Sequence, residues 1–243
     1  MKIDRFYSVI IGTELLNGRR KDSHFEFLNA RLVERGFSHV ASFLLKDDPK
    51  LIKECFELIK RDERAAMFCF GGIGATPDDL TRERAALVFT QGESAFEPSA
   101  KKIIEERFGE EAYPNRIQMA YLPLGARPLA NPINQIPGFG LENRYFFMPG
   151  FPSMAQAMVL EAITSFFDRY ETIHAISVEI QAPEERIIAF MQSLPQEIEA
   201  SSLPSMDLRL VFSMRCERLE ILQESYANLT SYLQEQNLTY QTL

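Results

Sequence analysis

The feature that most constrains this chain is a repeated alternation of apolar, strand-like runs with amphipathic, helix-like segments in its first 90 residues. The apolar runs are 5–11, 40–45 and 65–70, and the helical patterns are 24–35, 49–60 and a segment that begins near residue 82. Strands without a solvated polar face are typical of parallel sheets that helices cover on both sides. The pattern therefore predicts an α/β fold: a three-layer α/β/α domain with a mostly parallel sheet.

The residues at the ends of these segments agree with the assignment. Asp48 precedes Pro49 as a helix N-cap, and Gly36 follows the first helical pattern as a C-terminal stop. Beyond residue 114 the chain is rich in Pro, Gly and Asn, which indicates short strands and turns at a sheet edge. The expected pieces are strands at 119–122, 126–129 and 144–148 and a helix from residue 151 to about residue 170.

Residues 171–243 differ from the rest of the chain in charge. They hold 4 basic and 11 acidic side chains, a net charge of −7 out of −8 for the whole chain. The pattern predicts a separate small α+β unit, so the domains are 1–170 and 171–243. Its expected elements are a strand at 175–180, a helix at 183–194, a strand at 207–214 and a helix at 218–234.

Apolar Ile187, Ile188 and Phe190 on one helix favour a homo-oligomer, with a dimer expected.

Composition argues against several classes of protein. The acidic tail, without a basic stripe and without the glycines of an RNA-binding GXXG clamp, argues against nucleic acid as a partner. No apolar run approaches the roughly 18 residues of a membrane span, and no leader pattern is visible. Cys55, Cys69 and Cys216 are too far apart in the sequence to suggest a disulfide framework or a metal knuckle. We therefore expect a cytoplasmic protein that contacts no membrane.

One stretch, residues 71–81, carries most of the chemical information. It follows a predicted strand and precedes a helix, which is where open α/β sheets bind ligands. Glycines allow close backbone approach to an anion, whereas a hydroxyl and carboxylates can hold a cation that bridges to phosphate. An alternative is that the glycines only make a tight turn and the acids only favour the helix N-terminus. The residues concerned are Gly71, Gly72, Gly74, Thr76, Asp78, Asp79 and Thr81.

Two other strand ends bring polar groups to the same edge. Gly12-Thr13-Glu14 follows the first strand, and Asp47-Asp48 follows the second. Clustered carboxylates repel an anion unless a cation intervenes, so the pattern favours a metal-assisted pyrophosphate site. Asp48 has the alternative role of a helix cap, and Glu14 that of a surface acid. The Lys-Ser/Thr pair of a P-loop and the third glycine of a dinucleotide fingerprint are missing, which argues against P-loop ATP hydrolysis and hydride transfer.

Five ordered motifs over residues 5–160 resemble those of the CinA-like (competence/damage-inducible protein A) molybdopterin-binding family. The motifs are 11–18 with 22–24, 47–48, 71–81, 130–132 with 137–138, and 148–154. His24 stands where the family usually has Asn, and Ala75 where it often has Pro. The resemblance implies a MoaB/Mog-type fold, whose relatives bind molybdopterin or adenylylate it. The amidohydrolase domain of full-length CinA proteins is not in this sequence, so deamidation of nicotinamide mononucleotide is not expected.

The resemblance also implies a function, because CinA-type domains are linked to metal-dependent hydrolysis of nucleotide pyrophosphates such as ADP-ribose or FAD. Three classes stay open: this hydrolase, a non-catalytic pterin or nucleotide binder, and a structural or regulatory oligomer. The clustered carboxylates favour the hydrolase. The predicted catalytic residues are Asp47 and Asp79, and the predicted ligands of a divalent cation (Mg, Mn or Co) are Asp47, Asp79 and Glu14. The predicted ligand-binding residues are Gly12, Thr13, Glu14, Gly71, Gly72, Gly74, Thr76, Asp78, Thr81, Asn131, Pro149 and Gly150.

Overall fold

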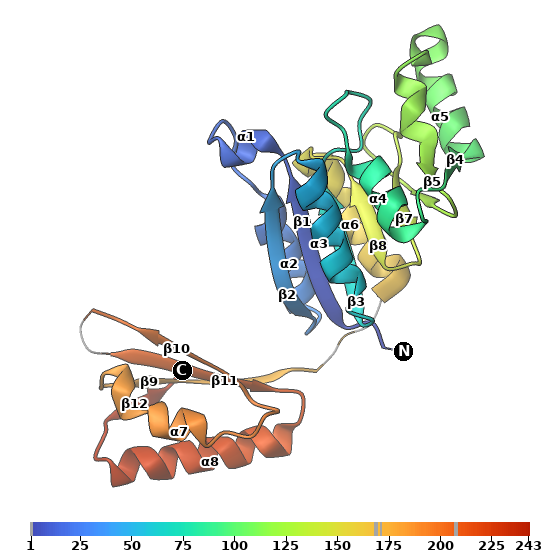
Figure 1. Cartoon of the computed structure of the whole chain (residues 1–243). Helices are drawn as coiled ribbons and strands as arrows, with labels where there is room; N and C mark the ends of the chain where they lie inside the picture. The colour runs from blue at the N-terminus through green and yellow to red at the C-terminus, as the bar shows by residue number, and fades with distance from the viewer. Residues whose placement is uncertain (1, 168–169, 171, 207–208) are drawn as a thin grey trace. The chain divides into compact units, whose positions relative to one another are not determined.

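The computed structural model describes residues 2–167, 170, 172–206 and 209–243, and it divides into two compact units, residues 1–170 and 171–243 (Figure 1). Each unit has its own sheet and its own hydrophobic core. The division falls where the acidic part of the sequence begins. Across these described ranges, no helix is both long enough and apolar enough to cross a membrane.

The first unit is built on a six-stranded sheet with the order β2-β1-β3-β8-β7-β6. Its strands are β1 (Arg5–Ile11), β2 (Ser38–Leu45), β3 (Ala65–Phe70), β6 (Arg127–Leu129), β7 (Gly138–Leu141) and β8 (Tyr145–Met148). The first four in spatial order pair in parallel, and β8–β7 and β7–β6 pair antiparallel. The prediction of a mostly parallel α/β sheet is confirmed. The carboxyl ends of β1, β2, β3 and β8 lie at one edge.

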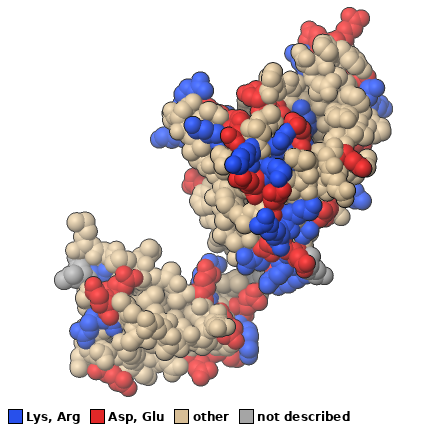
Figure 2. All heavy atoms as spheres, in the orientation of Figure 1, with Lys and Arg blue, Asp and Glu red and all other residues tan. Residues whose placement is uncertain are grey.

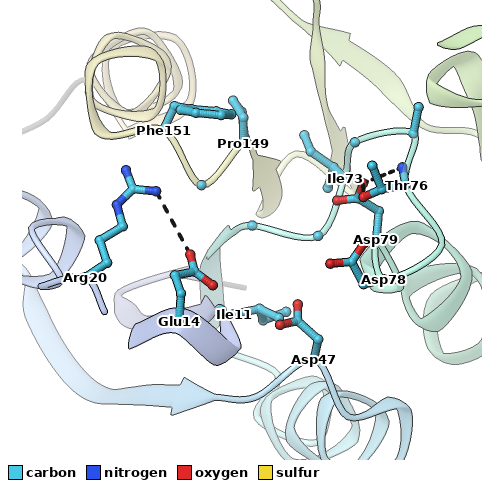
Figure 3. Close-up of a pocket in the computed structure, with 16 residues that line it drawn as sticks. Ile11, Glu14, Arg20, Asp47, Ile73, Thr76, Asp78, Asp79, Pro149 and Phe151 are labelled. Atoms are coloured by element: carbon cyan, nitrogen blue, oxygen red, sulfur yellow. Dashed lines mark hydrogen bonds and ion pairs between the residues drawn. The ribbon is translucent and has the colours of Figure 1, made fainter. Parts of the chain in front are cut away.

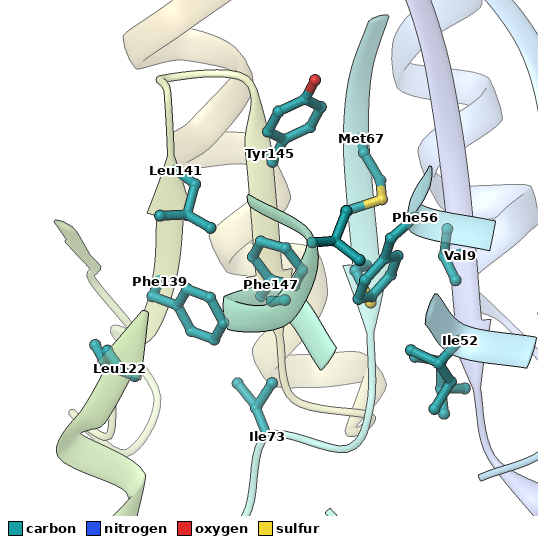
Figure 4. Packing of buried hydrophobic residues seen from close by; sticks show 14 of the residues in the cluster. Val9, Ile52, Phe56, Met67, Ile73, Leu122, Phe139, Leu141, Tyr145 and Phe147 are labelled. Carbon is teal, nitrogen blue, oxygen red and sulfur yellow. The ribbon is translucent and has the colours of Figure 1, made fainter. Parts of the chain in front are cut away.

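Helices cover both faces of this sheet. On one face lie α2 (His24–Val33) and α6 (Pro152–Phe167), and on the other lie α3 (Pro49–Lys60) and α4 (Thr81–Phe89). The short helix α1 (Thr13–Leu16) follows β1 at the carboxyl edge, and α5 (Pro98–Phe108) lies outside the sheet faces (Figure 1). Successive side chains of the fully buried strand β3 enter opposite cores, because Met67 and Cys69 pack with α3 and α4 whereas Phe68 and Phe70 pack with α2 and α6. Figure 4 shows the first of these cores, in which Phe147 and Phe139 stack.

The predicted helix signals are confirmed at the start of α3. One carboxylate oxygen of Asp48 accepts hydrogen bonds from the backbone N–H groups of Lys50 and Leu51, both at 2.9 Å, and Pro49 occupies the first turn. Side-chain acceptors at this position satisfy donors that the helix itself cannot pair. Asp48 is therefore a cap, the alternative role that the sequence left open for it.

Residues 94–123 form an addition that the sequence pattern did not predict. It contains β4 (Ser94–Phe96) paired antiparallel with β5 (Tyr121–Pro123), the helix α5, and two 3₁₀ turns at Gly109–Ala112 and Arg116–Ala120. The predicted strand at 119–122 is therefore wrong in its first half. Strand β7 was also missed, because its four residues include two glycines and carry no alternating apolar pattern.

The second unit is a four-stranded antiparallel sheet with the order β10-β11-β9-β12. Its elements are β9 (His174–Ile180), a 3₁₀ turn (Glu184–Arg186), α7 (Ile188–Gln192), β10 (Glu199–Pro204), β11 (Leu210–Cys216), α8 (Leu219–Glu235) and β12 (Tyr240–Thr242). The long helix predicted at 183–194 is thus a turn and a short helix. The predicted start of a strand at residue 207 lies outside the described residues. Strands β10 and β12 were missed because both are mostly exposed.

The apolar residues that favoured a dimer are largely used inside the second unit. Ile187 is 0% exposed and Phe190 5% exposed in its core, and only Ile188, at 44%, faces solvent. Most of the apolar surface expected there is therefore buried, and self-association remains a prediction with only Ile188 of these three residues exposed. On the face drawn in Figure 2, basic and acidic side chains lie interspersed rather than gathered into a basic stripe.

Candidate active site at the carboxyl edge of the sheet

A pocket of about 440 Å³ lies where the loops after β1, β2, β3 and β8 meet (Figure 3). We call it the acidic pocket, because four carboxylates line it. Its lining residues are Ile11, Gly12, Glu14, Arg20, Asp47, Gly71, Gly72, Ile73, Gly74, Ala75, Thr76, Asp78, Asp79, Pro149, Gly150 and Phe151. The structure therefore brings together all the predicted site residues except Thr13, Thr81 and Asn131.

Two glycines of the 71–74 loop are required by the fold, whether or not a ligand binds. Gly71 and Gly72 have φ values of 98° and 68°, which favour glycine. A Cβ on Gly71 would lie 2.2 Å from the carbonyl oxygen of Ile11, and one on Gly72 would lie 2.3 Å from the hydroxyl of Thr81. Gly72 is a predicted ligand-binding residue, but the closest contact of an added Cβ lies inside the protein. These glycines let the loop pack onto β1 and α4.

Thr81 supports the loop from beneath and does not line the acidic pocket. It is fully buried, and its hydroxyl donates to the carbonyl oxygen of Gly71 at 2.9 Å. Its backbone N–H donates to the carbonyl oxygen of Gly72 at 3.0 Å. These two bonds fix the turn between β3 and α4, so the structure places Thr81 behind the predicted ligand site.

Two aspartates are held by the same arrangement. Oδ2 of Asp47 accepts from both the backbone N–H and the hydroxyl of Thr13, at 2.8 and 2.7 Å. Oδ2 of Asp79 accepts from both corresponding groups of Thr76, at 2.8 and 2.6 Å. Within the described residues, Oδ1 of each aspartate makes no hydrogen bond. Each carboxylate is therefore fixed through one oxygen, and the other stays available.

The predicted cation ligands share the acidic pocket without forming a ready-made cluster. Among the residues that the structure describes, no three His, Cys, Asp or Glu side chains are grouped closely enough to hold a metal ion. Glu14 comes from α1, whereas Asp47 and Asp79 come from the loops after β2 and β3, and all three line the pocket in Figure 3. A metal site formed by these three residues stays a prediction that would need oxygens from the ligand or from water.

The first turn of α4 contributes a half-buried cation that the sequence reasoning missed. Arg82 donates through Nη1 to the carbonyl oxygens of Ile73 and Gly74, and burial lowers the pKa of its guanidinium from the ordinary value. These bonds hold two loop carbonyls toward α4. A basic side chain in the first turn of a helix opposes the helix dipole, and this was the available sequence signal.

Beside the acidic pocket lies a second, mostly apolar pocket of about 220 Å³. We call it the apolar pocket; its lining residues are Ile73, Gly74, Phe108, Met119, Asn131, Asn134, Ile136, Pro137, Pro149, Phe151 and Met154. Both pockets share Ile73, Gly74, Pro149 and Phe151. A single ligand with a charged part and an apolar part would fit such an arrangement.

Asn131 lies in the apolar pocket, away from the carboxylates. It is 4% exposed, and its amide nitrogen donates to Oδ1 of Asn134 at 2.7 Å and to the carbonyl oxygen of Ile136 at 3.0 Å. Its own Oδ1 accepts from the backbone N–H of Ile133 at 3.1 Å. The side chain therefore holds its loop in shape, and its predicted contact with a ligand stays a prediction.

Two residues at the mouth of the acidic pocket were also missed. The sequence reasoning saw only carboxylates at this edge, yet Arg20 lines it, and so does Phe151, which is 61% exposed. The guanidinium carbon of Arg20 lies 5.9 Å from the ring centroid of Phe151.

His24 does not line the pocket. Its ring is buried against Phe70, and its Nδ1 lies 2.8 Å from Oδ1 of Asp22.

Comparisons with known proteins agree with this geometry. Residues 8–169 match the family model described as "Probable molybdopterin binding domain". The chain is 30% identical over 171 residues to a "Putative competence-damage inducible protein" of Bacillus cereus (strain ATCC 10987 / NRS 248), covering 68% of this chain and 41% of that protein. It is 32% identical over 165 residues to a "CinA-like protein" of Acaryochloris marina (strain MBIC 11017), covering 65% and 39%.

A solved structure supports the same relationship. The crystal structure of the protein CinA from Thermoplasma acidophilum matches with a TM-score of 0.60 and 26% identity, over 67% of this chain and 96% of that one. The chain spans about two fifths of the length of the two curated relatives above. The resemblance noted from the ordered motifs is confirmed: this chain belongs to the family described as "Probable molybdopterin binding domain", with CinA-like proteins among its relatives.

Proposed function

We propose that the acidic pocket binds a nucleotide or pterin pyrophosphate together with a divalent cation and hydrolyses the pyrophosphate. The observation that carries this proposal is the convergence of Glu14, Asp47, Asp78 and Asp79 on one pocket beside the glycine loop. Four carboxylates would oppose a multiply charged anion at close range, so binding of that anion needs a compensating cation.

The donor atoms suit a hard divalent cation such as Mg²⁺ or Mn²⁺. Such ions prefer carboxylate oxygens, and Asp47 and Asp79 each offer Oδ1 while Oδ2 is held by a threonine. Glu14 would be the third protein ligand. When bound, the cation would neutralise the pyrophosphate and activate water. The threonine bonds would keep the two aspartates in place, so that their carboxylates need not reorganise when a ligand enters.

The apolar pocket supports an organic group on the ligand. Its mainly apolar lining and its four residues in common with the acidic pocket suit a ring attached to the phosphates. The family description names molybdopterin, a pterin, and an adenine or flavin ring would present similar apolar faces. The pair of pockets therefore supports a ligand with a ring at one end and phosphates at the other.

A second candidate is binding without hydrolysis. It is favoured by the lack of a preassembled group of three metal-ligating side chains within the described residues. A binder would use the loop and the apolar pocket to hold a phosphorylated pterin or nucleotide. No water would then need activation.

A ligand and metal panel separates the two functions. ADP-ribose, FAD, inorganic pyrophosphate and a molybdopterin-type ligand are tested for binding by calorimetry and for cleavage by product analysis, each with Mg²⁺, Mn²⁺ or Co²⁺. Metal-dependent release of nucleoside monophosphate supports the hydrolase. Binding without product supports the second candidate. No binding of any of these ligands with any of the metals would contradict both.

A further inference from the structure

Among the described residues that line the acidic pocket, Arg20 is the one with a cationic side chain. It belongs to the loop between α1 and α2, and Figure 3 shows its guanidinium between Glu14 and the Phe151 ring, at one side of the pocket. Its side chain therefore lines the space that a ligand of the acidic pocket would occupy.

The backbone of Arg20 is fixed, whereas its side chain is weakly held. The backbone N–H donates to the carbonyl oxygen of Glu14 at 3.1 Å. The guanidinium lies 4.0 Å from Oε1 of Glu14, and the two side chains are 38% and 40% exposed. Partly exposed ion pairs at such a distance contribute little, because solvent screens them. The side chain could therefore change partner at small cost.

A bound phosphate would be a stronger partner than Glu14. The planar guanidinium can donate two parallel hydrogen bonds to phosphate oxygens, and the pocket offers no other side-chain cation within its described lining. We infer that Arg20 leaves Glu14 when a pyrophosphate binds and donates to the phosphate at the mouth of the pocket. This inference rests on the proposed function, because it requires a phosphate ligand there.

The exchange would also affect Glu14. While Arg20 lies beside it, part of the charge of this carboxylate is compensated by the guanidinium. Once Arg20 turns to the phosphate, Glu14 becomes free to hold the cation predicted for the site. Phosphate binding and cation binding would thereby support each other through one arginine, which is a coupling between two ligands.

The neighbouring Arg19 supplies a matched control. It has the same side chain and charge and lies in the same loop, but it is exposed and does not line the acidic pocket. Its backbone N–H and its Nε donate to Oδ1 of Asn17 at 3.2 and 3.3 Å. Arg19→Gln therefore removes the same charge from the same loop without removing the proposed phosphate contact.

The test is calorimetric titration of inorganic pyrophosphate with excess Mg²⁺ into the full chain and into Arg20→Gln, Arg20→Lys and Arg19→Gln, with thermal unfolding to show that each variant is folded. We expect Arg20→Gln to weaken binding by roughly tenfold to a hundredfold, because a charged hydrogen bond is lost. Arg20→Lys should weaken it less, and Arg19→Gln should leave it within about twofold.

The outcomes separate the inference from the proposed function. If the unmodified chain binds pyrophosphate and Arg20→Gln binds it equally well, the role of Arg20 is wrong and the proposed function stands. Equal weakening by Arg19→Gln and Arg20→Gln would also contradict the inference, because a general charge effect would then explain both. If the unmodified chain binds no pyrophosphate, the role of Arg20 toward a phosphate is wrong, and the panel of organic ligands decides the proposed function by itself.

Discussion

Thr13 and Asp47 join the ends of two neighbouring strands through a single carboxylate oxygen. The backbone N–H and the hydroxyl of Thr13 both donate to Oδ2 of Asp47, and the hydroxyl in turn accepts from the backbone N–H of Asp47 at 3.2 Å. The loops after β1 and β2 are thus tied together at the floor of the acidic pocket. Asp47 therefore has a structural role that is separate from any role toward a ligand.

This tie predicts a difference between two small substitutions. Thr13→Val keeps the volume of the side chain but removes the hydroxyl, and we expect it to lower the free energy of unfolding by about 1 kcal/mol. Thr13→Ser keeps the hydroxyl and should cost less. Urea unfolding of both variants measures the difference. Equal stability of the two would mean that the hydroxyl contributes nothing to the tie.

Asp79→Asn tests the carboxylate as part of the proposed chemistry. The variant keeps an oxygen that can accept from Thr76 but removes the charge, so we expect a folded protein whose turnover falls about a hundredfold or more and loses its response to metal. Steady-state hydrolysis over a metal titration measures both. Asp48→Asn is the control, because Asn caps a helix about as well as Asp and Asp48 does not line the pocket. Unchanged turnover in Asp79→Asn would contradict the hydrolase and leave the binder.

Gly72→Ala should destabilise the first unit even without a ligand. The new Cβ would meet the hydroxyl of Thr81 at 2.3 Å, and the residue has a positive φ. Gly18→Ala is the matched control, since Gly18 also has a positive φ, 78°, but open space around its Cβ position. We expect Gly72→Ala to cost about 2 kcal/mol more than Gly18→Ala, measured by thermal or urea unfolding. Similar losses would show that the loop moves aside easily.

The stability of the first unit should fall at mildly acidic pH because of His39. Its ring nitrogens lie 3.0 Å from the hydroxyl of Ser8 and 3.0 Å from Oδ1 of Asn29, and burial lowers the pKa of the imidazole from its ordinary value. The unfolded chain therefore takes up the proton first. The contribution of neutral His39 is fully present above the unfolded pKa of about 6.5 and is lost as the pH falls through the lower, folded pKa.

A comparison of variants isolates this effect. Urea unfolding at pH 7.5 and at pH 5 should show a smaller loss of stability for His39→Gln than for the unmodified chain. His174→Gln, which changes a histidine of the second unit, should retain the full loss in the first unit. If His39→Gln shows the same dependence on pH as the unmodified chain, another group is responsible.

The parallel part of the fold could be predicted because its signals are local. The strands β1 and β3 are buried along almost their whole length, and Ser8 is the one buried position in them without an apolar or aromatic side chain. The helix cap at Asp48 and the motif at 71–81 were predictable for the same reason, because each depends on residues that are adjacent in the sequence. By contrast, β10 is largely exposed and β7 is only four residues long, and neither leaves a pattern that distinguishes it from a loop.

The sequence predicted most of the residues that line the acidic pocket, but it predicted few of the contacts that these residues make. The strand ends predicted that the aspartates and glycines lie at one edge of the sheet, yet no local pattern shows that Arg20 reaches that edge from a loop. The sequence signal for Arg82, a basic residue in the first turn of α4, does not show that it donates to the 71–74 loop. The sequence also could not show which atoms an added Cβ would meet at each glycine. Gly72 was expected to face a ligand, whereas a Cβ added to it would point toward Thr81.

The buried cysteines allow the opening of each unit to be followed by alkylation of its thiols. Burial raises the pKa of Cys55 to about 12 and raises that of Cys69 well above its ordinary value, so neither thiol forms the reactive thiolate while the first unit stays closed. Cys216 is buried in the core of the second unit. Alkylation at each site must therefore wait for its own unit to open. Mass spectrometry of a single alkylated sample would report the opening rates of the two units separately, without any engineered cysteine.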